Sequence, residues 1–114
     1  MTLLNQTKNI QLVSQLEDAH TFLKRSKGLL GKKSIDPDYA MLIRNCKSIH
    51  TFFMNFPIDV AFIDKNFVVK KIYRNLKPGR LTLPILKAQS VIEFKSGFIH
   101  TNNVEVGDQL YVVH

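Results

Sequence analysis

The sequence contains little that could cross-link the chain or carry it through a membrane. Its single cysteine, Cys46, excludes an intrachain disulfide and permits a reducing compartment. There are no internal repeats, low-complexity segments or long linkers, and no apolar stretch approaches the ~20 residues of a membrane-spanning helix. A chain of 114 residues is therefore expected to fold as one domain, residues 1–114, without a disulfide to hold it together.

The N-terminal residues also lack the apolar core of a signal peptide. Polar side chains interrupt every apolar run between Met1 and His20 before the ~7 apolar residues of such a core can form. This absence predicts a protein that stays in the cytoplasm.

Motifs of the common enzyme and cofactor sites are missing as well. There is no G-x-S-x-G, no phosphate-binding loop, no dinucleotide fingerprint and no zinc-ligand spacing. Gly28 and Gly31 lie near the end of a predicted helix rather than at its start, which disfavours a phosphate cradle. The sequence thus identifies no catalytic residue and predicts no metal and no cofactor.

Positive charge, in contrast, is abundant and patchy. The formal net charge is +7, and the basic residues gather within residues 24–33 and 65–80, the second of which holds no acidic residue. Such patches attract nucleic acid or anionic lipid, but no nucleic-acid motif accompanies them. We therefore favour a solvated face that keeps the protein soluble. Nucleic-acid binding through residues 65–80, with Phe67 and Tyr73 stacking on bases, is the weaker alternative.

Hydrophobic periodicity predicts a mainly β (α+β) domain with one helix. Ser14 and Glu17 form a capping-box pattern, and the apolar residues after them recur at helical spacing, which predicts a helix over about residues 15–30. The other apolar segments are typical of short strands separated by turns. The strands are expected at residues 10–13, 39–43, 49–54, 58–63, 67–73, 88–95 and 109–113. The predicted fold is a small antiparallel β-barrel or sandwich of six to seven short strands, with the N-terminal helix packed on it.

Short motifs spread over about residues 8–113 carry a family resemblance. They are Ala19-His20-Thr21, Arg25, Gly28-Leu29-Leu30-Gly31, Met41-Leu42-Ile43, Thr51-Phe52-Phe53-Met54, Pro57–Asp64, Val68-Val69, Val91-Ile92-Glu93-Phe94, Gly97 and Val106-Gly107-Asp108. In this order and spacing they resemble the DUF192 family of small prokaryotic proteins. The resemblance implies a mainly β fold with a helix near the start and no established activity, in a family where many relatives carry export signals. Phe53 departs from the pattern, since many relatives have tryptophan there, and it keeps the stacking surface without the indole donor.

The segment Cys46–Asp64 embeds polar groups in an otherwise apolar run, which a fold or a site must require. Cys46, His50 and Met54 are spaced four apart, so on a helix they would share a face and could bind a soft metal. On a straight strand, however, the first and last would lie ~27 Å apart. We therefore favour structural roles, with Cys46 as a small buried hydrophobe and Met54 as core filling.

Five residues are candidates for a ligand-binding cleft. They are Arg25, His50, Thr51, Asp59 and Glu93. Both carboxylates lie in apolar strands, where a carboxylate must be paired or hydrogen-bonded, and the Arg25 guanidinium is the expected partner of one of them. His50 supplies a titratable nitrogen beside a hydroxyl. Purely structural roles are also open: His50 bonded to a neighbouring loop, and Asp59 fixing the turn before it.

These residues predict a non-enzymatic module that binds a small ligand or a protein partner. The alternative is a small hydrolase in which His50 works with Asp59 or Glu93, and its mark would be a perturbed pKa in an open pocket.

Overall fold

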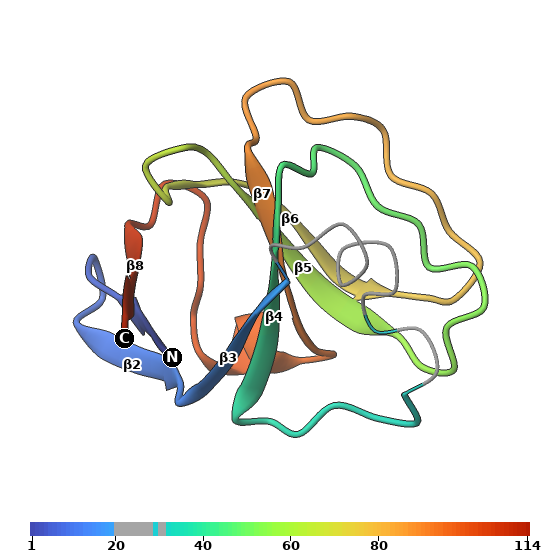
Figure 1. Ribbon diagram of the computed structural model, residues 1–114, viewed down its shortest axis with the longest axis horizontal. Helices are drawn as coiled ribbons and strands as arrows, with labels where there is room; N and C mark the ends of the chain where they lie inside the picture. Colours follow the sequence, from blue (N-terminus) through green and yellow to red (C-terminus); the bar gives the residue numbers. More distant parts are fainter. Residues whose placement is uncertain (20–28, 30–31) are drawn as a thin grey trace.

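The computed structural model describes residues 1–19, 29 and 32–114, in which eight strands form two sheets and one short helix lies near the C-terminal end (Figure 1). The elements are β1 (Thr2–Asn5), β2 (Ile10–Val13), β3 (Gln15–Ala19), β4 (Tyr39–Arg44), β5 (Ile58–Ile63), β6 (Val69–Leu76), β7 (Ser90–Lys95), α2 (Phe98–Thr101) and β8 (Leu110–Val113). The described part contains no helix long and apolar enough to cross a membrane.

The larger sheet has the strand order β3-β4-β7-β5-β6, with β3 and β4 parallel and the other pairs antiparallel. The smaller sheet has the order β2-β1-β8, so the first and last strands of the chain pair directly. The prediction of a mainly β fold is confirmed. A closed barrel is wrong, because both sheets have free edge strands within the described residues, and the strand number is eight rather than six or seven.

Both faces of the five-stranded sheet are buried, which explains why its central strands carry apolar side chains on both faces, with Asp59 and Glu93 as the buried exceptions. All six residues of β5 are buried, and side chains alternate between two clusters along the strand. Ala61 and Ile63 face the cluster that the three-stranded sheet and α2 cover. Val60 and Phe62 face the other cluster, which residues of the loops such as Ile49 cover.

The N-terminal helix predicted over residues 15–30 is wrong where the structure can be compared with it. Gln15–Ala19 form β3, which pairs with β4 from Gln15↔Tyr39 to Ala19↔Ile43. Ser14 does not cap a helix, because its backbone N–H and its hydroxyl both bind the Asp38 carboxylate. Residues 20–28 and 30–31, the rest of the predicted helix, lie outside the described residues.

Residues 49–54, predicted as a strand, instead belong to the long loop between β4 and β5. Only His50 makes a β-bridge there, to Leu81 of the loop between β6 and β7. The segment is held by side chains rather than by a sheet: the Thr51 hydroxyl donates to the Lys77 carbonyl at 2.6 Å and accepts the Arg80 N–H at 2.9 Å. Short side chains that bond neighbouring backbone compete with regular strand pairing.

Candidate functional site

Asp59 is a buried carboxylate that joins three segments of backbone. One carboxylate oxygen accepts the N–H of Asn75 at 2.8 Å, and the other accepts those of Gly97 and Ile99 at 3.1 and 2.9 Å. The side chain lies 1% exposed, so these bonds replace water that it has lost. Asp59 thus holds α2 and the end of β6 to the middle of the sheet, rather than the turn that precedes it.

Glu93 is also buried but lies in a different setting. Its neighbours across the sheet are Met41 and Val60, both apolar, and no described residue donates a hydrogen bond to its carboxyl group. Burial raises the pKa of Glu93 to about 7. Nearby, the Tyr39 hydroxyl donates to Glu17 at 2.7 Å, and burial, that bond and the charges of both glutamates raise the pKa of the phenol.

The two carboxylates point to opposite faces of the sheet. Val60 pairs with Glu93 and Asp59 pairs with Phe94, so the pleat directs Asp59 to the face of Phe94 and Glu93 to the other. A single small ligand in a surface cleft therefore cannot contact both. This geometry separates residues that the sequence places among one set of candidates.

His50 and Thr51 are neighbours with opposite environments. His50 is exposed and its ring stacks on Phe52, with the centroids 5.3 Å apart. Thr51 is fully buried in the loop contacts described above. Arg25, the expected partner of a carboxylate, lies outside the described residues. Among the residues that are described, no hydrogen bond joins His50 to Asp59 or Glu93.

The Cys46–His50–Met54 series does not converge either. The Cys46 thiol donates to the Ser48 carbonyl at 3.0 Å, Met54 is buried in the apolar cluster, and His50 faces solvent. No group of three or more metal-ligating side chains is found in the part of the chain that the structure describes.

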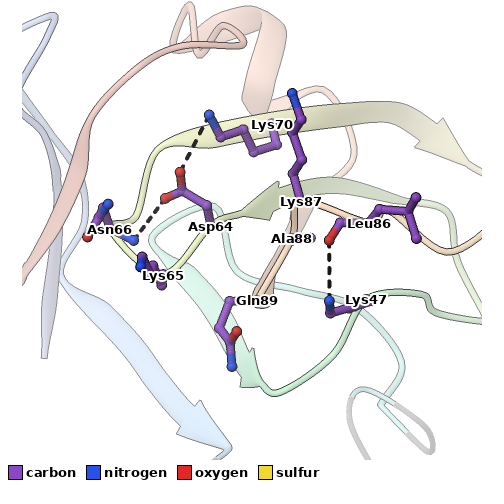
Figure 2. Close-up of a pocket in the computed structure, with 9 residues that line it drawn as sticks. All are labelled: Lys47, Asp64, Lys65, Asn66, Lys70, Leu86, Lys87, Ala88 and Gln89. Atoms are coloured by element: carbon purple, nitrogen blue, oxygen red, sulfur yellow. Dashed lines mark hydrogen bonds and ion pairs between the residues drawn. The ribbon is translucent and has the colours of Figure 1, made fainter.

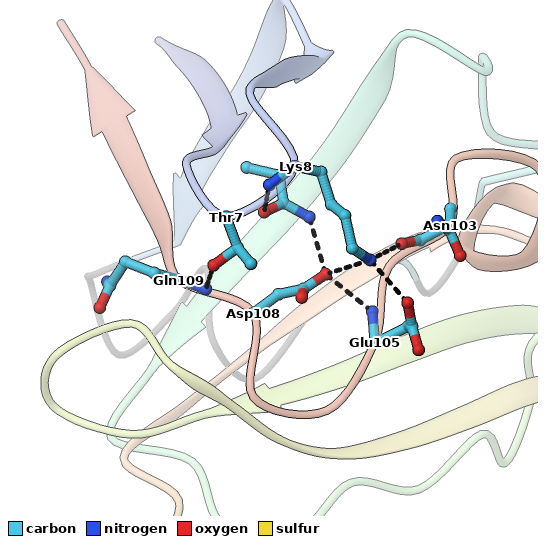
Figure 3. Close-up of polar contacts among 7 residues, drawn as sticks. Thr7, Lys8, Asn103, Glu105, Asp108 and Gln109 are labelled. Carbon is cyan, nitrogen blue, oxygen red and sulfur yellow. Dashed lines mark hydrogen bonds and ion pairs between the residues drawn. The ribbon is translucent and has the colours of Figure 1, made fainter.

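A cluster of charges that sequence reasoning missed joins the two ends of the chain (Figure 3). The Lys8 ammonium contacts Glu105 at 2.8 Å, Asp108 at 3.2 Å and the Asn103 carbonyl at 2.7 Å. The buried Asp108 also accepts the side-chain amide of Asn5 at 2.9 Å. Burial raises the pKa of Asp108, but its hydrogen bonds outweigh burial and leave it below the usual value. Its one ammonium is bound by two carboxylates, so this cluster is a structural tie with no surplus of positive charge.

A second charged cluster lines a cavity of about 360 Å³ at one end of the five-stranded sheet (Figure 2). It contains a single carboxylate, that of Asp64, and four lysines. The basic residues are Lys47, Lys65, Lys70 and Lys87. They flank strand ends: the first follows β4, the next two bracket the turn between β5 and β6, and the last precedes β7. We call this cavity the lysine pocket.

Asp64 is already engaged by the turn that it begins. One of its oxygens accepts the N–H groups of Asn66 and Val68 at 2.8 and 2.9 Å, and the other lies 3.4 Å from the Lys70 ammonium. Burial raises the pKa of Asp64, but these donors outweigh burial, so the pKa lies below its usual value. One bound carboxylate cannot neutralise four lysines, so the lysine pocket has a surplus of positive charge. It can attract an anion.

The sequence indicated half of this pocket. Lys65 and Lys70 belong to the basic stretch 65–80, whereas Lys47 and Lys87 come from two other loops that the fold brings to the same sheet end. The signal that could have found them is position, because each lies within three residues of the end of a strand. Loops at the end of a rigid sheet commonly form binding sites.

Comparison with known proteins gives one consistent result. The profile of the DUF192 family, described as "Uncharacterized ACR", matches residues 3–112. The UPF0127 protein of Pyrococcus horikoshii is 36% identical over 95% of this chain and 96% of its own length. A UPF0127 protein of Thermococcus kodakarensis is also 36% identical, over 93% of this chain and 69% of its own length.

Two solved structures share the fold. A protein of unknown function from Novosphingobium aromaticivorans matches with a TM-score of 0.82 and 21% identity, over 97% of this chain and 82% of that one. A putative transcription regulator from Sinorhizobium meliloti matches with a TM-score of 0.82 and 20% identity, over 96% of this chain and 89% of that one. At such identities the likeness concerns the fold alone.

Proposed function

We propose that this chain, which belongs to the DUF192 family, is a non-enzymatic module that binds a small anionic ligand in the lysine pocket. The observation that carries the proposal is the charge of the pocket: among the described residues, four lysines and one hydrogen-bonded carboxylate line it. Phosphate or carboxylate groups fit this chemistry, because lysine binds them as a flexible point charge with three donors.

The hydrolase alternative has less support. It requires His50 to work together with a carboxylate. His50 instead stacks on Phe52, and the Asp59 carboxylate accepts hydrogen bonds from three backbone N–H groups. Glu93 has the raised pKa that the alternative asks for, but it lies buried in an apolar cluster rather than in an open pocket. Binding explains the surplus charge without requiring a catalytic pair.

Nucleic-acid binding through residues 65–80 is a second candidate, and one observation favours it: Lys65 and Lys70 line the pocket within that basic stretch. The Sinorhizobium meliloti protein of the same fold is described as a putative transcription regulator. This candidate predicts affinity for an oligonucleotide that falls steeply as salt is added. The small-ligand proposal predicts instead that a free anion binds and competes.

The test is a titration followed by NMR with inorganic phosphate, pyrophosphate and citrate as probes. We expect chemical-shift changes at residues 64–70 and 86–89 that saturate with at least one of these anions. Lys70→Met should weaken that affinity about tenfold, because a charge-assisted hydrogen bond is lost. The change keeps a side chain of similar length and removes only the charge.

Lys71→Met is the matched control. Lys71 is the next residue of β6, it is exposed, and it does not line the pocket. Equal weakening by both variants would mean that only overall charge matters and would contradict the pocket. Shift changes that never appear with any of the three anions would contradict the proposal as a whole.

A further inference from the structure

The two longest loops described, residues 45–57 and 77–89, run beside one another on the side of the molecule away from the three-stranded sheet (Figure 1). Five backbone hydrogen bonds of 2.8 to 3.0 Å join them, among them those from the Thr82 N–H to the Ile49 carbonyl and from the Ile85 N–H to the Lys47 carbonyl. The loops are therefore one paired unit rather than two independent segments.

Two buried threonines hold the paired loops together through hydrogen bonds. Besides the Thr51 contacts already described, the Thr82 hydroxyl accepts the Ile49 N–H at 2.9 Å. Both threonines are at most 4% exposed, so their bonds are shielded from water. Polar contacts of this kind define one geometry, because a buried hydroxyl without its partner is costly.

The paired loops expose large apolar side chains. Four of them are each at least 68% exposed. They are Phe53, Leu81, Leu83 and Leu86, which we call the apolar loop surface. Because Thr82 points inward, its neighbours on either side point outward, so the exposure of both leucines follows from the backbone. Exposed apolar groups this large, gathered on one unit, mark an interaction site.

Phe53 is exposed to solvent and also has a strained backbone conformation. It is 88% exposed and has a φ of +67°, a conformation that bulky side chains rarely adopt. No packing in the core offsets the backbone strain of a phenylalanine at this position. Backbone strain held by surrounding bonds is frequent where a side chain must be presented to a partner.

The charged side chains of the two loops are all of one sign. Residues 44–58 and 65–87 contain no aspartate or glutamate, while Lys47, Lys77 and Arg80 are exposed beside the apolar residues. The partner is therefore expected to be anionic as well as apolar. Protein interfaces are depleted in lysine, and nucleic acids offer no apolar phase to leucine. A bilayer with anionic headgroups offers both components at once.

We propose that the apolar loop surface docks on an anionic phospholipid membrane. Phe53, Leu81 and Leu83 enter the boundary between headgroups and acyl chains, and Lys77 and Arg80 contact the lipid phosphates. This surface shares Leu86 with the lysine pocket, but none of the residues changed in the test below lines that pocket.

The test is cosedimentation of the chain with vesicles of phosphatidylcholine alone and of phosphatidylcholine mixed with phosphatidylserine. We expect binding to the mixed vesicles only, weakening as salt is added. Replacing both Leu81→Ser and Leu83→Ser should lower partitioning about tenfold, because two side chains no longer leave water. Val106→Ser, at a residue 61% exposed outside both loops, is the matched control and should leave partitioning unchanged.

The contribution of charge to membrane binding is tested with the same vesicles and charge-reversal variants. Arg80→Glu should abolish most binding to the mixed vesicles, whereas Lys95→Glu, at the other end of β7, should not. Absence of binding to mixed vesicles, or binding that survives the double leucine change, overturns the proposal. A dimer in sedimentation that the leucine changes dissolve would identify a second copy as the occupant instead, and oligonucleotide binding lost with the same changes would identify nucleic acid.

Discussion

Lysine plays different parts in the two charged clusters of this protein. Lys8 meets two carboxylates and a carbonyl within 3.2 Å, in a cluster where no positive charge is in excess. In the lysine pocket, the described residues supply four lysines and one carboxylate, and Lys70 pairs with that carboxylate. The local balance of charge, rather than the residue type, therefore separates a structural tie from a candidate site. A paired lysine stabilises the fold, and a surplus lysine is available to a ligand.

The largest effect should come from disrupting the cluster around Lys8. Asp108→Ala removes the acceptor of Asn5, Lys8 and the Glu105 N–H, and leaves buried donors unpaired. We expect the free energy of unfolding to fall by about 3 kcal/mol, measured by urea denaturation. Glu105→Ala is the control, because that side chain is 59% exposed and should cost under ~1 kcal/mol. Equal losses would show that burial is not what makes the cluster stabilising.

A buried carboxyl group outside both clusters makes the stability of the fold depend on pH. The folded-state pKa of Glu93 is raised from 4.5 to about 7, so its contribution to stability is fully present below its unfolded pKa and is lost as pH rises through about 7. Glu93→Gln should remove this dependence and be more stable than the unchanged chain above pH ~8, by on the order of 3 kcal/mol. Denaturation at several pH values measures it. A glutamine variant that is less stable at high pH would mean that the ionised carboxylate has a partner.

A smaller gain in stability is expected from relieving the backbone strain at Phe53. Phe53→Gly should raise the free energy of unfolding by ~0.5–1 kcal/mol, because glycine adopts a φ of +67° without steric cost and no core contact is lost. Thermal unfolding measures the shift. Phe52→Gly, at a residue without a positive φ, is the control and should not stabilise. A loss of stability on Phe53→Gly would indicate that the ring packs against the protein after all.

The smallest effect on stability is expected in the lysine pocket. Lys87→Met removes an exposed ammonium from a site with surplus positive charge, so the free energy of unfolding should change by less than ~0.5 kcal/mol. Denaturation checks this, and the anion titration run on the same variant should show weakened binding. A clear loss of stability would place Lys87 with the structural lysines rather than with the pocket.

Sequence patterns predicted the strands that are apolar on both faces. They missed the elements whose structure depends on pairing with residues distant in the sequence. Ile58–Ile63 could be predicted because a continuous apolar run is typical of a strand buried on both sides. Gln15–Ala19 could not, because its parallel pairing with β4 is invisible to local periodicity, and because Ser14 bonds Asp38 instead of a helix end. Local propensity is a weak prior that tertiary pairing overrides.

The candidate site shows the same limit. The sequence marked Asp59 and Glu93 as buried carboxylates in apolar strands, and both are buried. Which face each one points to depends on the register between β5 and β7, which composition does not reveal. Lys47 and Lys87 were missed because they are 40 positions apart in the sequence and meet only in the folded sheet.

The pairing of the first strand with the last also constrains how the chain reaches its native state. Thr2 lies opposite Val113, so β1 has its full set of neighbours only when the C-terminal residues have left the ribosome. The five-stranded sheet, whose last strand ends at Lys95, can form before that moment, whereas the three-stranded sheet cannot. Folding during synthesis should therefore finish in a late step, in which Asn5 and Asp108 meet across nearly the whole chain.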